Sequence, residues 1–128
     1  MTSPTNHIVM RGAVDPGQGV EQAWGWLNFL TDAQTTGIEG VTVGTVRIDV
    51  GAENPVHIHP NCAEIILFIT GTVEHVVGDE LVEMSQGDVL IVPAGMPHKA
   101  RNIGSGPVEM VVIYNSGQRG FELAVSGS

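Results

Sequence analysis

The chain has one cysteine, Cys62, among its 128 residues. A disulfide within this sequence is therefore impossible, and a metal site built from several thiolates is excluded. Basic residues are also scarce, because five Lys and Arg stand against fourteen Asp and Glu, which gives a formal net charge of −9. Nucleic acids and anionic membranes attract basic surfaces, so we expect neither as a partner.

Long apolar runs are missing as well. No segment is apolar over enough residues to cross a bilayer, and residues 1–7 lack the charged start and apolar stretch of a leader. We therefore expect a cytoplasmic protein without a membrane partner. Hydrophobic residues nevertheless make up 42% of the chain and charged residues 15%, a balance that favours a packed core over disorder. The length suits one domain.

A helical period over three turns is also absent, and short apolar runs separated by glycine or proline take its place. Val46, Ile48 and Val50 alternate with polar residues, as in a strand with one buried face. Gly78-Asp79 is a two-residue hairpin signal. The pattern predicts an all-β, single-domain sandwich or barrel. Strands are expected at residues 41–50, 55–59, 64–69, 72–77, 80–84, 89–92, 98–101, 108–114 and 121–125.

The first 40 residues have a different pattern. Residues 24–30 form an aromatic run that fits a strand or a packed lid, and residues 31–40 have the composition of a polar loop. We predict an N-terminal segment 1–40 that supplies a strand or a dimer-contact arm. A β-barrel at 41–125 and a flexible tail at 126–128 follow it.

Three histidines and one glutamate are spaced so that they can meet. His57 and His59 lie two residues apart on an expected strand, so their side chains share a face. The turn at 60–63 returns the chain to Glu64, and a proline-bounded bend precedes His98. We predict that these four residues bind one divalent transition metal, and Fe, Mn, Ni, Co and Zn all suit this donor set. Four protein ligands leave open positions on the ion for a substrate.

The two remaining histidines, His7 and His75, have no ligand-like neighbours at comparable spacing. We interpret them as surface or satisfied residues, and expect replacement of His75 to leave metal content unchanged. Tyr114 is interpreted as a packed residue in preference to a proton donor. Trp24 and Trp26 fit core packing, closure of the barrel mouth or a dimer contact.

Two stretches of the chain resemble the two motifs of the cupin superfamily. The resemblance implies a double-stranded β-helix, which is a jelly-roll-like small barrel, with His57, His59, Glu64 and His98 as metal ligands. It also implies a homodimer. The matching positions are Gly51, His57, His59, Glu64 and Gly71 in the first motif, and Gly87, Pro93, Gly95, His98 and Asn102 in the second.

The metal and its surroundings predict an enzyme for a small oxygenated organic molecule. Alternation along the strand from Glu64 directs Ile66 and Phe68 inward, and Met96 lies beside a ligand turn, so these three are the expected substrate contacts. Glu64 is the candidate catalytic residue because it could carry a proton after leaving the metal. We favour dioxygenase-type oxidation, since the lining lacks obvious acid–base pairs. A redox-neutral isomerase, lyase or cyclase, and a non-catalytic ligand-binding protein, are the alternatives.

Overall fold

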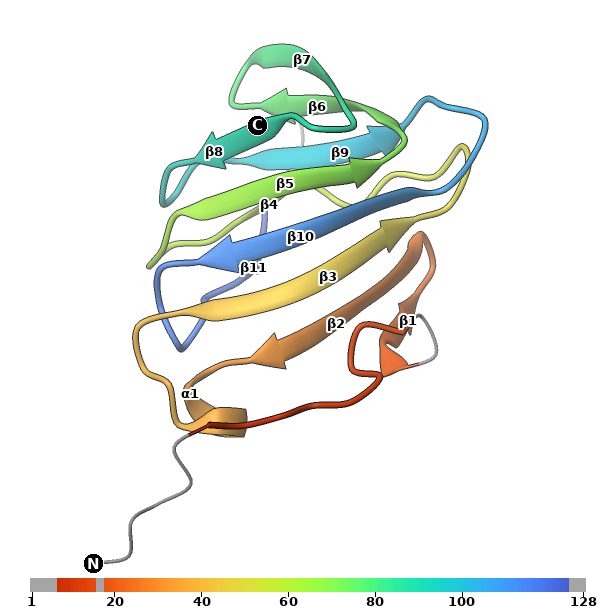
Figure 1. Ribbon diagram of the computed structural model, residues 1–128. Coiled ribbons are helices and arrows are strands. Elements are labelled where there is room, and N and C mark those ends of the chain that lie inside the picture. The colour runs from red at the N-terminus through yellow and green to blue at the C-terminus, as the bar shows by residue number, and fades with distance from the viewer. Residues whose placement is uncertain (1–6, 16–17, 125–128) are drawn as a thin grey trace, which may run out of the picture.

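Two antiparallel β-sheets face each other in the structure, a computed structural model that describes residues 7–15 and 18–124 (Figure 1). Every strand pairing is antiparallel between the described strands. This arrangement confirms the predicted all-β, jelly-roll-like small barrel. No helix in the described part of the chain has the length and apolar character needed to traverse a bilayer.

The larger sheet has six strands and carries most of the alternating apolar sequence. Along Thr42–Ile48 and Val108–Tyr114, every second residue is buried, as expected for strands with one face on the core. In spatial order its strands are β1 (Val20–Gln22), β2 (Gly25–Thr31), β3 (Thr42–Ile48), β10 (Val108–Tyr114), β5 (Glu64–Thr70) and β8 (Val89–Val92).

The smaller sheet has five strands and covers the inner face of the larger one (Figure 1). Its hairpin turns at Gly78-Asp79, where Val77 pairs with Glu80, which confirms the predicted turn. Gly78 has a φ of 60°, a conformation that glycine adopts without steric cost. In spatial order the strands are β11 (Glu122–Leu123), β4 (His57–Ile58), β9 (His98–Asn102), β6 (Thr72–Val77) and β7 (Glu80–Ser85).

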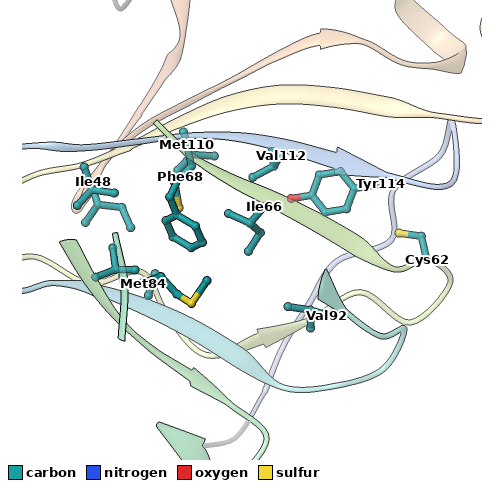
Figure 2. Close-up of a cluster of buried hydrophobic side chains, with 13 residues drawn as sticks. Ile48, Cys62, Ile66, Phe68, Met84, Val92, Met110, Val112 and Tyr114 are labelled. Carbon is teal, nitrogen blue, oxygen red and sulfur yellow. The ribbon is translucent and has the colours of Figure 1, made fainter. Parts of the chain in front are cut away.

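The apolar core fills the space between the sheets. Figure 2 shows Ile66, Phe68 and Met110 of the larger sheet pointing inward, and Met84 contributes to the same cluster from the smaller sheet. Tyr114 lies at one end of this cluster (Figure 2). The Tyr114 ring is itself part of the buried core.

Residues 1–40 differ in part from the expectation. The run predicted at 24–30 forms β2, which pairs with β3 and extends the larger sheet. The polar loop predicted at 31–40 is wrong in one respect, because it contains the short helix α1 (Ala33–Thr36). Asp32 caps this helix by accepting hydrogen bonds from the backbone of Gln34 and Thr35, an interaction that propensity over so few residues does not reveal. The division after residue 40 and the dimer-contact arm stay predictions, and the tail at 126–128 lies outside the described residues.

Candidate metal centre

The four predicted metal ligands meet at one end of the barrel interior. His57 on β4 pairs directly with His98 on β9, and Glu64 begins β5 in the opposite sheet. His59 follows β4 on the same face as His57. All four side chains are buried, and each offers one donor atom within 4.8 Å of the others. The structure thus brings together, from three places in the chain, the residues that the motif spacing selected.

Backbone carbonyls hold the three imidazoles in one tautomer. The Nδ1–H of His57 donates to the carbonyl of Pro55 at 2.8 Å, and that of His59 donates to Gly120 at 2.8 Å. The Nδ1–H of His98 donates to Met96 at 3.2 Å. A neutral imidazole that donates from Nδ1 carries its lone pair on Nε2, so each ring presents a metal-ligating nitrogen.

Glu64 lies among these lone pairs. Its Oε1 is 2.8 Å from Nε2 of His98 and 3.2 Å from Nε2 of His59. The His59 nitrogen has no hydrogen-bond partner among the described residues. Carboxylate and imidazole lone pairs repel at these separations unless a proton or a metal ion lies between them. The geometry and the donor set therefore fit a divalent transition metal.

Burial controls the protonation of the cluster. It lowers the pKa of His57 to about 4, so the ring is neutral and able to bind metal at pH 7. Burial alone would raise the pKa of Glu64, but in the metal-free protein a proton on Nε2 of His59 or His98, hydrogen-bonded to the carboxylate, outweighs burial and holds that pKa below its usual range. Glu64 is therefore a carboxylate at neutral pH, which is the form that ligates a cation.

Tyr114 supports the carboxylate, a role that the sequence interpretation missed. Its hydroxyl donates a 2.9 Å hydrogen bond to Oε2 of Glu64. Burial, with the nearby Glu64 charge, raises the pKa of Tyr114 well above its ordinary value, so the phenol stays protonated and remains a donor. Tyr114 reaches Glu64 because of the register between β10 and β5, in which these two residues are paired. A local sequence motif does not encode such a register.

A cavity of about 480 Å³ opens beside the cluster. His57, Glu64 and His98 form its polar end. The remaining wall is mainly apolar, so the cavity suits a small organic molecule with few polar groups. Its apolar wall includes Trp24, Leu27, Phe29, Val46, Ile66, Met110, Val112, Phe121 and Leu123.

The three expected substrate contacts divide between wall and core. Ile66 lines the cavity, whereas Phe68 and Met96 are absent from its lining. Phe68 does point inward, as alternation requires, but it lies deeper in the barrel with its ring edge against His75. Alternation gives the face on which a side chain lies and not its depth, and this explains the difference.

His75 is misread by the sequence interpretation. It is neither exposed nor satisfied, because its side chain is buried and neither ring nitrogen has a hydrogen-bond partner among the described residues. It also lines the cavity and stacks on His98 with ring centroids 5.7 Å apart. Burial lowers the pKa of His75 to about 4, so the ring is neutral at pH 7.

Arg119 is a second residue that the sequence interpretation missed. Its guanidinium lies over the rings of Phe29, Tyr114 and Phe121, at 4.5 to 5.5 Å from their centroids. It lines the cavity, and none of the ion pairs within the described part of the chain involves it. A positive charge in this wall favours anionic ligands. Its loop follows β10, and sequence spacing alone does not show that the loop folds back over the cavity.

Comparisons with known proteins agree with this fold. The family described as "Cupin domain" matches residues 44–114, which is more than half of the chain. The chain therefore belongs to the cupin family, as the two motifs indicated.

Curated relatives include plant proteins of the germin-like group. Germin-like protein 1-1 of Oryza sativa subsp. japonica is 32% identical over 93 residues, which cover 67% of this chain and 43% of that protein. The germin-like protein of Morus alba is 32% identical over 99 residues, covering 72% and 47%. Auxin-binding protein ABP19b of Prunus persica is 29% identical over 98 residues, covering 71% and 47%. The chain spans less than half the length of these relatives.

Solved structures of similar shape include oxalate decarboxylases. That of Bacillus subtilis at pH 4.6 aligns with a TM-score of 0.77 at 23% identity, over 82% of this chain and 29% of that chain. The formate complex of the Lactobacillus farciminis enzyme aligns with a TM-score of 0.77 at 20% identity, over 82% and 32%. These likenesses show the fold.

Proposed function

We propose that the protein is a mononuclear metal-dependent enzyme that acts on a small oxygenated organic molecule. One observation carries this proposal: the convergent donors of His57, Glu64 and His98 face a cavity large enough for a substrate. A sealed structural site would use its donors to close the coordination sphere, whereas a catalytic site keeps one side open. The oxalate decarboxylases of similar fold act, as their name says, on a small oxygenated acid.

The substrate that the cavity favours is more apolar than oxalate. Aliphatic and aromatic side chains form most of the wall, and Arg119 adds one positive charge. A molecule with an apolar body and one or two oxygen functions would bury its body against this wall and direct an oxygen to the polar end. Ile66 is the proposed substrate contact that the cavity supports. Phe68 and Met96 do not line the cavity, and their proposed role is to support the side chains that form its wall.

In the proposed enzyme, the residues of the cluster have different chemical roles. His57, His59 and His98 would hold the ion, and Glu64 would complete the ligand set or hold a proton at Oε1 or Oε2. Tyr114 keeps Oε2 in place by donating a hydrogen bond from its hydroxyl. A bound divalent ion supplies Lewis acidity, and a redox-active one also supplies electron transfer to dioxygen. Apolar walls exclude competing water from the substrate.

Within this class we favour dioxygenase-type oxidation. Among the described residues at the polar end, Glu64 is the one carboxylate, and no second side chain is paired with it for general acid–base exchange with a substrate. Oxidation by a metal and dioxygen does not require such a pair. A redox-neutral isomerase, lyase or cyclase is the second candidate, favoured by the contact between Glu64 and Tyr114, which would let the carboxylate accept a proton and return it. A non-catalytic ligand-binding protein is the third.

Elemental analysis and oxygen uptake separate these candidates. Purified untagged protein is analysed for metals, loaded in turn with Fe(II), Mn(II), Ni(II), Co(II) and Zn(II), and assayed with diketones, catechols and hydroxy acids. Oxygen consumption that needs Fe(II) supports the oxidative branch. Substrate turnover without oxygen consumption supports the redox-neutral branch. Protein that binds none of the five metals would refute the proposal.

Assembly and location complete the proposal. We propose a cytoplasmic homodimer whose partners are small molecules and not nucleic acid or membrane. Sedimentation equilibrium at micromolar concentration tests the dimer, since the 13.5 kDa chain would sediment at twice its mass. Fractionation of the source cells tests the location.

A further inference from the structure

His75 is a buried polar residue that the fold does not explain. It lies on β6, where the alternation that buries Val73 also turns His75 inward, and its side chain is 1% exposed. Both ring nitrogens lack a hydrogen-bond partner among the described residues. Burying a polar group without a partner lowers the stability of a protein. An apolar side chain of similar size would serve packing better at this position.

His75 is part of the lining of the cavity that opens beside the candidate metal centre. The ring lines the cavity together with His98, on which it stacks at an interplanar angle of 15°. It is not one of the four residues whose donors converge within 4.8 Å. His75 therefore lies next to the metal centre without belonging to its ligand set.

A neutral imidazole offers one N–H donor and one acceptor nitrogen. Polar side chains do line the cavity, but none of the described residues hydrogen-bonds either nitrogen of this ring. A polar group of a ligand in the cavity is the partner that would satisfy the ring.

We propose that His75 binds the substrate by hydrogen-bonding an oxygen other than the one directed at the metal centre. The inference rests on the proposed metal-dependent function and names its substrate class: a largely apolar organic anion with two separated oxygen functions. One function meets the metal centre or Arg119, and the other meets His75. Hydroxylated aromatic acids have this chemistry.

Two variants and a set of four probes test the proposal. Co(II)-loaded wild type, His75→Leu and His75→Gln are titrated with benzoate and with 2-, 3- and 4-hydroxybenzoate. Binding is followed in the visible spectrum of Co(II). Leucine removes both nitrogens at similar volume, whereas glutamine keeps one donor and one acceptor. Metal content is measured for all three proteins, and thermal unfolding is measured on their metal-free forms.

The wild type is expected to bind one hydroxybenzoate about two- to tenfold more tightly than benzoate, the effect of one added hydrogen bond. His75→Leu should lose this preference, keep its affinity for benzoate and keep its metal. His75→Gln should retain part of the preference. The metal-free leucine variant should unfold at the same temperature as the wild type or higher.

The assignment of His75 would be overturned if His75→Leu kept the wild-type ratio of hydroxybenzoate to benzoate affinity, or if the wild type showed no preference for a hydroxybenzoate. Either result would leave the proposed metal centre unaffected. A lower unfolding temperature for metal-free His75→Leu would assign the ring a structural role and overturn the inference. Loss of Co(II) from both variants would make His75 a metal ligand instead. Failure of the wild type to bind Co(II) would refute the proposed function and the inference together.

Discussion

Asn102 and Glu64 are both buried polar residues inside the same barrel, yet their surroundings differ. The Asn102 amide donates to the carbonyls of Ile48 and Gly106 at 3.0 and 2.9 Å, and its oxygen accepts from the backbone N–H of Gly104 at 2.9 Å. All these partners are backbone groups, and the amide is fully engaged.

The cluster around Glu64 is not satisfied in this way. Lone pairs of His59 and His98 face its carboxylate, and His75 nearby has no partner among the described residues. A polar group that completes its bonds within the chain stabilises the fold, whereas one that leaves bonding capacity toward a cavity is available to a ligand. The comparison therefore assigns Asn102 to stability and the Glu64 cluster to binding. Four predictions test this division.

The largest effect is expected from His98→Ala. Removing one of four ligands should weaken metal affinity by at least about 100-fold, since even loss of a residue that only supports a ligand costs about 10- to 100-fold. The barrel should still fold, because its apolar core is built from side chains other than the four ligands. Competition titration with a chelator gives the affinity, and circular dichroism reports the fold. Full metal occupancy in this variant would remove His98 from the ligand set.

Asn102→Ala, on the same strand, should give the opposite result. Three backbone groups would lose their partner, so the free energy of unfolding should fall by about 2–3 kcal/mol. Metal affinity should stay within about twofold of wild type. Urea unfolding of the metal-free protein measures the first quantity and chelator competition the second. A stable Asn102→Ala variant with weakened metal binding would reverse the assignment of the two regions.

The pH dependence of stability should also come from the cavity end. The folded protein holds the pKa of His57 and of His75 at about 4, whereas an unfolded histidine titrates near 6.5. The unfolded chain therefore binds more protons between these values. Stability of the metal-free protein is greatest above pH 6.5 and declines as the pH falls toward 4.

His75→Gln sharpens this test because glutamine does not titrate. The variant should lose less stability than the wild type between pH 7 and pH 5, by about 1–2 kcal/mol. His7→Gln is the matched control, since His7 is exposed in the structure. Urea unfolding at each pH gives the values. Equal slopes for His75→Gln and the wild type would mean that burial does not shift the His75 pKa.

Tyr114→Phe should have the smallest effect. It removes the hydroxyl that donates to Glu64 and keeps the buried ring. Metal affinity should fall by about tenfold, the lower end of what supporting hydrogen bonds contribute, and stability should change little. Chelator competition again gives the value. Unchanged affinity would show that the three histidines position Glu64 sufficiently by themselves.

Motif spacing and strand alternation predict the strands from β3 onward and the four clustered residues, because both depend on local geometry, whereas β1 and α1 are not predicted. His57 and His59 share a face wherever that segment is a strand, and the turn to Glu64 is short. The contributions of Tyr114, His75 and Arg119 depend on which strands pair and on how a loop returns over the cavity. Tyr114 meets Glu64 through a register between strands 50 residues apart in sequence. Single-sequence patterns contain no information of this kind.

The bond from His59 to the carbonyl of Gly120 links the metal centre to the segment that follows β10. The Asn61 side chain makes two hydrogen bonds to the same segment: it donates to the carbonyl of Gln118 and accepts from the N–H of Gly120. Metal binding that immobilises the His59 ring would therefore also restrict the motion of this stretch of backbone. Protease cleavage between residues 115 and 121 would then become slower when the metal binds. The rate of digestion would report the fraction of metal sites that are occupied.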